Sequence, residues 1–301
     1  MTRSLRLPPP VPVALIGSGM IGTDLLVKLT RSPVLKPVLF VGRRPDSPGL
    51  LHAEKLGIKT STGGLEALLA DADNYEVVID ATSAPAHVRH WAALKPLGKK
   101  VIDMTPSNIG QMTVPAISPD GLAEHGNVNV VTCGGQASIP LAHAICQVME
   151  EVRYIEIVAS FSYHAAGPAT KAHTDEYIEI TQEALSHFTG CAHTKVIGIM
   201  NPARPPVDMQ VTVSVMGERP DMERVTKAVR VMVAHIKGYV PGYSLVLEPT
   251  WDHNRVVVSV RVVGRGDWLP TFAGNLDIIN CAAIASAECY ARSPRREVAH
   301  A

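Results

Sequence analysis

The sequence is poor in cysteine pairs, in net charge and in long apolar runs, and each absence excludes a class of protein. Its five cysteines in 301 residues form no C-x-x-C pair, which argues against a disulfide framework or a zinc site and fits a reducing cytoplasm. The formal net charge is +0 with no basic block, so nucleic acid is not expected as a partner. No apolar stretch approaches the ~20 residues of a membrane helix. We therefore expect a cytoplasmic protein without a metal, a nucleic-acid partner or a membrane segment.

What remains is the composition of an ordinary globular protein, with 46% hydrophobic and 19% charged residues. The length suggests about two domains. Up to Thr132, short apolar runs such as Val11–Ile16 alternate with helical segments, which predicts a parallel sheet buried on both faces. From Val152 onwards, strand-like alternation dominates, which predicts an α+β unit. The fold class we expect is an α/β Rossmann dinucleotide-binding domain plus an α+β domain with a mostly antiparallel sheet.

The change of pattern also suggests domain boundaries. We place the dinucleotide-binding domain at residues 1–132 together with 270–301, because the late Ala-rich helix is of a kind that returns to the first domain. The catalytic and dimerisation domain then covers residues 133–269. An antiparallel sheet can leave one face uncovered, so we expect a homodimer.

A glycine-rich turn follows the first expected strand. It reads G-x-G-x-x-G between a strand and a helix and consists of Gly17, Ser18, Gly19, Met20, Ile21 and Gly22. Glycines at these positions allow the tight turn, the close approach of a pyrophosphate and close packing of the helix. We expect the six residues to bind a dinucleotide. The alternative is a glycine-rich turn without a ligand.

The residues that follow the next two strands bear on the choice of cofactor. An acid after the second strand would bind the ribose 2′-hydroxyl of NAD, but Arg43 and Arg44 stand there. Two guanidinium groups suit a 2′-phosphate, so the pair favours NADP, unless one or both arginines point to solvent. Thr82 ends a later strand, at the edge of the sheet where a nicotinamide dinucleotide would lie.

Cys133 occupies the turn between another strand and a helix, and Gly134 and Gly135 follow it. Free N–H groups and the helix dipole at such a site favour a thiolate over a thiol. The same N–H groups could hold an oxyanion after the thiolate has attacked a carbonyl. The alternative is a half-buried structural cysteine.

A nucleophilic thiol beside a dinucleotide suits one reaction. The thiolate attacks an aldehyde, a hydride passes to the nicotinamide, and a second nucleophile takes the acyl group from the resulting thioester. The chemistry is reversible, so an activated acyl group could equally be reduced to an aldehyde.

Six motifs resemble those of the acylating acetaldehyde dehydrogenase family, which converts acetaldehyde, NAD and coenzyme A to acetyl-CoA. The motifs are Gly17–Leu25, Asp80–Ser83, Thr132–Pro140, Ala166–Pro168, Tyr239–Tyr243 and Ala273–Asp277. The resemblance implies that Cys133 is the acyl-thioester nucleophile and that coenzyme A is the co-substrate. It also implies a 4-hydroxy-2-oxovalerate aldolase as partner.

The resemblance further implies cofactor contacts in three places. One is the turn Ser18–Ile21 and another is Asn275. The third is a loop made of Ala165, Ala166, Gly167, Pro168, Ala169, Thr170, Lys171, Ala172 and His173.

The sequence departs from the family pattern at two positions that matter. Arg44 stands where the family has the acid that reads the ribose of NAD. Val211 stands where the family has an acid that has been proposed to support the thiol. Asp208 would point to the opposite face of the strand from Val211, so an imidazole from His164 or His173 is the other candidate.

Two other functions stay open. A semialdehyde dehydrogenase acting on an acyl phosphate shares this layout but would need a phosphate-binding set near the cysteine. A non-catalytic or decayed structural partner of an aldolase would explain the lost acid but not the retained cysteine motif.

Overall fold

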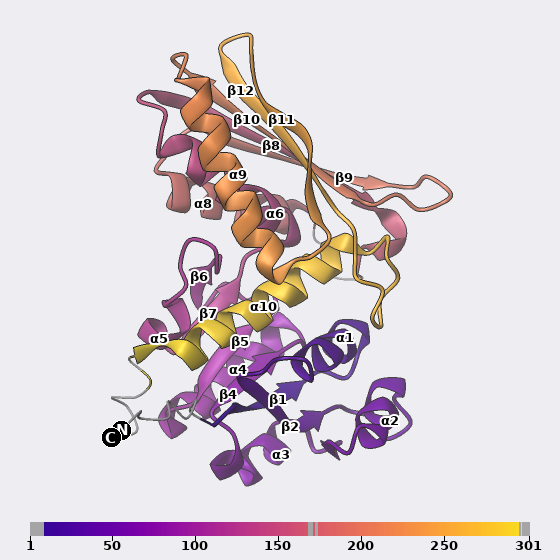
Figure 1. Cartoon of the computed structure of the whole chain (residues 1–301). Helices are drawn as coiled ribbons and strands as arrows, with labels where there is room; N and C mark the ends of the chain where they lie inside the picture. Colours follow the sequence, from indigo (N-terminus) through magenta and orange to yellow (C-terminus); the bar gives the residue numbers. More distant parts are fainter. Residues whose placement is uncertain (1–8, 168–170, 172–173, 295, 297–301) are drawn as a thin grey trace, which may run out of the picture.

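The computed structural model describes residues 9–167, 171, 174–294 and 296. These residues form two sheets, which lie at the bottom and the top of Figure 1. The long helix α10 (Gly274–Arg292) crosses between them.

The first sheet has seven strands in the order β3-β2-β1-β4-β5-β7-β6, and every pair is parallel. The strands are β1 (Val11–Ile16), β2 (Leu35–Val41), β3 (Lys59–Ser61), β4 (Val77–Asp80), β5 (Lys100–Asp103), β6 (Gln111–Thr113) and β7 (Asn127–Val130). Their helices are α1 (Met20–Leu29), α2 (Pro48–Lys55), α3 (Gly64–Ala70), α4 (Ala84–Leu94) and α5 (Gly121–His125), with short 3₁₀ turns η1 (Ala72–Asn74) and η2 (Lys95–Leu97).

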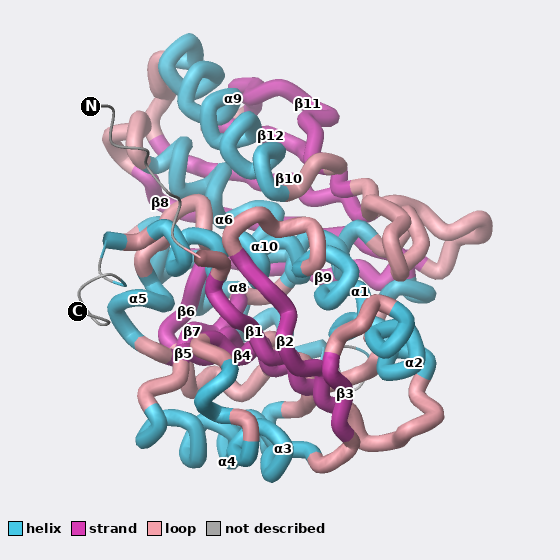
Figure 2. Tube along the Cα trace, turned by 60° about the horizontal axis from the view of Figure 1, so that its bottom comes forward, coloured by secondary structure: helices cyan, strands magenta, loops and turns pink. Residues whose placement is uncertain are grey.

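Helices cover both faces of this sheet, which is why its strands are apolar throughout. Leu15 of β1 belongs to the core that β1 forms with α1 and α10. Its neighbour Ile16 belongs to the core that includes Leu68 of α3 and Leu94 of α4. Figure 2 shows the sheet between these two layers of helices.

The second sheet has five strands in the order β11-β12-β10-β8-β9. All of its pairs are antiparallel except β8 with β9. The strands are β8 (Val152–Ser162), β9 (Thr194–Asn201), β10 (Met209–Gly217), β11 (Tyr243–Asp252) and β12 (Arg255–Val262). The helices are α6 (Cys133–Cys146), α8 (Thr174–Thr189) and α9 (Met222–Tyr239), with a 3₁₀ turn η3 (Tyr163–Ala165).

Helices α6, α8 and α9 pack against one face of this sheet (Figure 1). On β10 the side chains of Val211, Val213 and Val215 are fully buried, whereas Gln210 and Met216 are exposed. This alternation is the period-two pattern of a sheet with one covered face. The predicted fold class, a parallel Rossmann-type sheet plus a mostly antiparallel second sheet, is confirmed.

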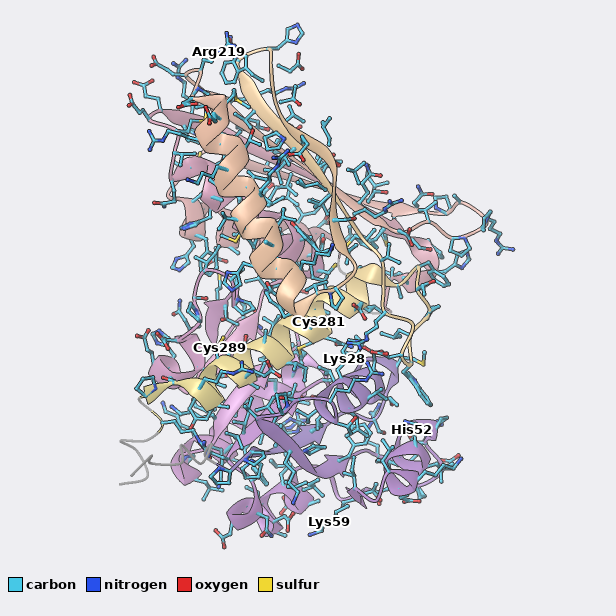
Figure 3. All side chains as sticks on the ribbon, in the orientation of Figure 1. Lys28, His52, Lys59, Arg219, Cys281 and Cys289 are labelled. Atoms are coloured by element: carbon cyan, nitrogen blue, oxygen red, sulfur yellow. The ribbon has the colours of Figure 1, made fainter. Side chains whose placement is uncertain are left out.

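Helix α10 joins the two cores. Its residues Ile278 and Cys281 belong to the core of the second sheet, and Ala282 and Ala283 to the core of the first. Lys28 of α1 forms an ion pair of 2.8 Å with Asp277 of α10, and Figure 3 shows Lys28 where these helices meet. The contacts of α10 therefore tie the glycine turn that precedes α1 to the second sheet.

Candidate active site

A cavity of about 290 Å³ lies where the carboxyl ends of the first sheet meet α6, α8 and α10. It brings together five residues that the sequence predicts for the site. They are Ile21, Thr82, Cys133, Gly167 and Asn275. Other lining residues include Thr105, Asn129, Thr132, Glu176 and Tyr177. Residues far apart in the chain thus converge on one space.

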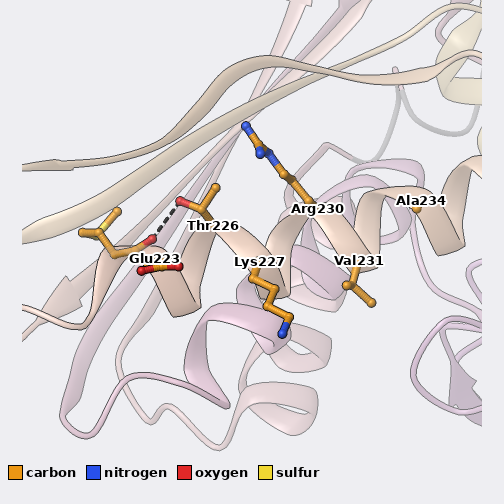
Figure 4. A pocket seen from close by; sticks show the side chains of 7 residues that line it. Glu223, Thr226, Lys227, Arg230, Val231 and Ala234 are labelled. Carbon is orange, nitrogen blue, oxygen red and sulfur yellow. Dashed lines mark hydrogen bonds between the residues drawn. The ribbon is translucent and has the colours of Figure 1, made fainter.

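A second hollow, of about 750 Å³, lies on the surface of α9 (Figure 4). All of its lining residues come from that one helix, including Glu223, Lys227 and Arg230. None of the predicted site residues lies there, and the exposed face of a single helix is no cleft for a small substrate.

Cys133 is the first residue of α6 and is 8% exposed. Burial raises the pKa of its thiol to about 11, and hydrogen bonds from Tyr177 and from backbone N–H groups only partly oppose this. The expectation that the thiolate is favoured is therefore wrong for this conformation, because desolvation outweighs the helix N-terminus.

Two of the first N–H groups of α6, those of Gly134 and Gly135, already have partners. The side chain of Thr132 accepts a hydrogen bond of 3.1 Å from the Gly135 N–H. The hydroxyl of Tyr177 accepts one of 3.1 Å from the Gly134 N–H and lies 3.8 Å from the Cys133 sulfur. A Cβ at Gly134 would collide with this hydroxyl, which explains the glycine. The importance of Tyr177 was missed from the sequence, since no local pattern relates it to Cys133.

Val211 is the position at which the family resemblance leads one to expect an acid. It is fully buried on β10 and pairs with Ala159 of β8. The Cβ of Ala159 lies 3.3 Å from where a Gly134 Cβ would be, so this part of the sheet faces the start of α6. Among the described residues no carboxylate forms a hydrogen bond with Cys133, and Asp208 precedes β10 without lining the cavity.

The glycine turn has the geometry that its motif predicts. Gly17 has a φ of +112°, and a Cβ there would lie 2.5 Å from the Ala81 carbonyl oxygen. A Cβ at Gly22 would collide with the Gly17 carbonyl. Gly19 precedes α1, and no side chain caps this helix. The N-terminal N–H groups of α1 therefore suit an anion.

The arginine pair lies on a loop that is fixed to this turn. The Ser47 hydroxyl donates a hydrogen bond of 3.1 Å to the Ser18 carbonyl, and a Cβ at Gly42 would collide with the Ser18 hydroxyl. Arg43 and Arg44 are both exposed, and the Arg44 side chain approaches Asp46 to 3.8 Å.

Asn275 links α10 to the predicted cofactor loop. Its side-chain N–H donates a hydrogen bond of 3.1 Å to the Ala165 carbonyl. Its Oδ1 is buried and has no hydrogen-bond partner among the described residues. A buried acceptor of this kind, facing a cavity, suits an amide donor of a ligand.

The structure locates only part of that loop. Ala166 is buried, and the Lys171 ammonium lies 4.0 Å from the centre of the Tyr163 ring. Pro168, Ala169, Thr170, Ala172 and His173 lie outside the described residues. His164 is exposed and does not line the cavity.

Thr82 is held by a buried polar network that the sequence did not suggest. Its hydroxyl donates to Asp80, which also contacts His87 and His90 at 2.9 and 2.7 Å. Although burial opposes ionisation, these hydrogen bonds hold the pKa of Asp80 well below its usual range. The network continues from His87 towards Asp103 (3.5 Å) and fixes the floor of the cavity.

Comparison with a solved structure first identifies the fold. The crystal structure of aspartate semialdehyde dehydrogenase II from Vibrio cholerae matches 95% of this chain and 99% of its own with a TM-score of 0.64 and 13% identity. At this identity the match shows the fold. The parallel first sheet and the mostly antiparallel second sheet are therefore arranged as in that two-sheet protein.

Closer relatives then identify the family. An acetaldehyde dehydrogenase of Pectobacterium atrosepticum is 53% identical over 92% of this chain and 95% of its own length. One from Spirochaeta aurantia is 46% identical over 96% and 97%. The family model described as prokaryotic acetaldehyde dehydrogenase, dimerisation, matches residues 133–270. The chain belongs to the acetaldehyde dehydrogenase family, as its motifs predict.

The described residues contain neither a membrane-spanning helix nor a cluster of metal ligands. None of their helices is both long and apolar enough to span a bilayer. None of their His, Cys, Asp and Glu side chains form a group of three or more able to hold a metal ion.

Proposed function

We propose that the protein is a CoA-acylating aldehyde dehydrogenase, which converts an aldehyde and coenzyme A to acyl-CoA through a thioester on Cys133. The reverse reaction, reduction of an acyl-CoA, uses the same groups. The observation that carries the proposal is the shared cavity, in which Cys133 meets Ile21 of the glycine turn and Asn275 of α10. Family membership supports the aldehyde as substrate.

The chain has residues suited to three parts of a nicotinamide dinucleotide. The uncapped start of α1 suits the pyrophosphate, and the unpartnered Oδ1 of Asn275 suits the carboxamide N–H. Thr82 and Gly167 line the space between them. Arg43 and Arg44 suit the 2′-phosphate of NADP, whereas the family resemblance favours NAD. The bound nicotinamide supplies the hydride acceptor.

Cys133 carries the covalent chemistry. Its sulfur bonds to the carbonyl carbon of the aldehyde as the thiol proton leaves to solvent, and the carbonyl oxygen becomes an alkoxide. When that carbon has lost its hydride, an acyl thioester remains on Cys133. The thiol of coenzyme A then loses its proton to solvent and bonds to the acyl carbon, and the Cys133 sulfur leaves as a thiolate at the N-terminus of α6.

The test is turnover by the purified protein with acetaldehyde and coenzyme A, followed as cofactor reduction with NAD and separately with NADP. We expect turnover that requires coenzyme A and is lost in Cys133→Ala. Turnover that needs inorganic phosphate in place of coenzyme A would show the acyl-phosphate reaction instead. No turnover with any of several aldehydes, with or without an aldolase, would show a non-catalytic protein.

We also propose a homodimer that forms through the uncovered face of the second sheet. Ile197 and Ile199 of β9 and Met216 of β10 are 39%, 43% and 37% exposed on that face, and such apolar surface marks an interface. The matching family model, which includes dimerisation in its description, covers this sheet. In sedimentation velocity we expect a dimer for the wild type and a monomer for Ile199→Glu, and a monomeric wild type would contradict the proposal.

We also propose a cytoplasmic location and a complex with an aldolase. The unpaired cysteines fit a cytoplasmic enzyme. The family resemblance favours a complex with a 4-hydroxy-2-oxovalerate aldolase. Co-expression of the two chains followed by size-exclusion chromatography tests this complex, and separate elution at micromolar concentration would contradict it.

A further inference from the structure

We propose that the Tyr177 hydroxyl is a catalytic hydrogen-bond donor to the Cys133 sulfur. In this role it assists the thiolate in place of the carboxylate that the family resemblance leads one to expect at position 211, where this chain has Val211. The proposal rests on the function proposed above for Cys133. It assigns to α8 a role in the chemistry.

The geometry allows the Tyr177 hydroxyl to donate its proton to the sulfur. A phenolic oxygen carries one proton and can accept as well as donate. The Tyr177 oxygen accepts from the Gly134 N–H at 3.1 Å, so one lone pair is used and the proton is directed elsewhere. The Cys133 sulfur lies 3.8 Å away, within the range of a hydrogen bond to sulfur. The hydrogen bond from the Gly134 N–H also polarises the Tyr177 hydroxyl, which makes the hydroxyl a better donor.

The surroundings of Tyr177 hold the hydroxyl in this place. The Thr181 hydroxyl donates to the Tyr177 carbonyl at 2.6 Å and lies 2.6 Å from the Thr132 hydroxyl, which caps α6. The Tyr177 ring meets Phe161 edge-on with centroids 6.0 Å apart. The side chain is 8% exposed. A donor fixed by its neighbours costs little reorganisation when charge develops on the sulfur.

Because the Cys133 sulfur is buried, its thiolate needs a hydrogen-bond donor to form. Desolvation raises the pKa of Cys133, and it raises the pKa of Tyr177 well above its ordinary value too. Tyr177 therefore remains a neutral donor at any working pH, while the sulfur must bear charge twice in a cycle, at attack and at departure. A hydrogen bond to an ionised partner is about twice as strong as a neutral one, so the donor acts when the thiolate forms.

Glu176 is the competing residue on α8. It lines the same cavity but is exposed and forms no hydrogen bond or ion pair with a described residue. A carboxylate there could act only as a base, whereas a hydroxyl donor stabilises the thiolate itself. The two roles predict different effects on the titration of Cys133, which the following experiment separates.

The experiment measures the rate at which iodoacetamide alkylates Cys133 between pH 7 and 10, by peptide mass mapping. Loss of the donor raises the thiol pKa by roughly one unit, so Tyr177→Phe is expected to be alkylated about tenfold more slowly at pH 8. In the assay with aldehyde and coenzyme A, kcat is expected to fall about 10²-fold with little change in the KM for aldehyde. Tyr75→Phe, which removes a buried hydroxyl that donates to the Leu68 carbonyl in a core of the first sheet, is the matched control.

A second variant covers the case in which Tyr177→Phe does not fold. Gly134→Ala displaces the hydroxyl without changing the tyrosine, because a Cβ at Gly134 collides with it, and the same slower alkylation is expected. Alkylation of folded Tyr177→Phe at the wild-type rate would overturn the proposal, as would loss of kcat in Glu176→Gln with none in Tyr177→Phe. If the wild type shows no CoA-dependent turnover, the proposed function fails while the alkylation rates still decide the role of Tyr177.

Discussion

The strand-to-helix turns before α1 and before α6 look alike in sequence, but the N–H groups at their helix N-termini have different partners. Both turns follow a parallel strand and are rich in glycine, Gly17–Gly22 after β1 and Cys133–Gly135 after β7. At α1 no side chain caps the helix. At α6 the N–H groups of Gly134 and Gly135 already donate to Tyr177 and Thr132.

The N–H groups at the start of α1 are available to a ligand, whereas those of Gly134 and Gly135 at the start of α6 hold side chains next to Cys133 in place. Free N–H groups at α1 can bind an anion that comes from outside. At α6 the N–H groups of Gly134 and Gly135 already donate within the protein, so an oxyanion would compete with Tyr177 and Thr132 for them. The glycines differ in the same way: Gly17 makes room for the Ala81 carbonyl, whereas Gly134 makes room for the Tyr177 hydroxyl.

The largest expected effect comes from Cys133→Ala, which removes the nucleophile from one turn and leaves the other intact. Turnover should fall by about 10⁴-fold or more, in line with the loss of other catalytic nucleophiles. The affinity for the dinucleotide, measured by quenching of protein fluorescence, should change less than about twofold because α1 is untouched. Turnover within tenfold of the wild type would show that the turn at α6 is structural only.

Next in size is Gly17→Ala, which tests the turn at α1. A φ of +112° is strained for alanine, and the Cβ would lie 2.5 Å from the Ala81 carbonyl oxygen, so we expect about 1–3 kcal/mol of lost stability and weaker dinucleotide binding. Gly19→Ala is the matched control, because its Cβ meets nothing within 4 Å. It should bind the dinucleotide more weakly without a comparable drop in Tm. Equal melting of Gly17→Ala and the wild type would contradict the account of the turn.

These turns also show how much of the fold the sequence could predict. The inner strands of the first sheet were predictable because runs such as Val11–Ile16 are apolar throughout and lie under helices on both faces. The edge strands β3 and β6 have three residues each, too few for a period to be visible. Four strands of the second sheet were predictable from their alternation, since one face is covered and the other is not. The edge strand β9 was not, because Val196 is its only buried residue.

In the site, local motifs were predictable and long-range contacts were not. Cys133, Thr82 and Asn275 stand in motifs that can be recognised one at a time, and they line one cavity. Tyr177 stands 44 positions from Cys133 on an ordinary amphipathic helix, so only the packing of α8 on α6 brings it to the sulfur. The buried network around Asp80 joins β4, α4 and β5 in the same way.

A smaller effect, on the preference between NADP and NAD, is expected for Arg44→Asp. This variant tests whether the arginine pair beside the turn at α1 binds a 2′-phosphate. If the exposed pair Arg43–Arg44 holds a 2′-phosphate, the ratio of kcat/KM for NADP to that for NAD should fall at least about tenfold, the loss of one bidentate phosphate contact. Arg219→Asp makes the same charge change far from the first sheet (Figure 3) and should leave the ratio unchanged. An unchanged ratio in Arg44→Asp would show that this arginine points to solvent.

The smallest effect is expected for Thr132→Ala, which removes the internal cap that distinguishes α6 from α1. Its hydroxyl accepts from the Gly135 N–H at 3.1 Å, so the variant should lose about 1 kcal/mol of stability, roughly 2 °C in Tm for a chain of this size. Ser83→Ala is the matched control, since Ser83 precedes α4 without a side-chain cap hydrogen bond, and it should melt with the wild type. Because Thr132 also contacts Thr181 beneath Tyr177, kcat should fall with Tm in Thr132→Ala. Equal Tm values for both variants would show that the N-terminus of α6 is as open as that of α1.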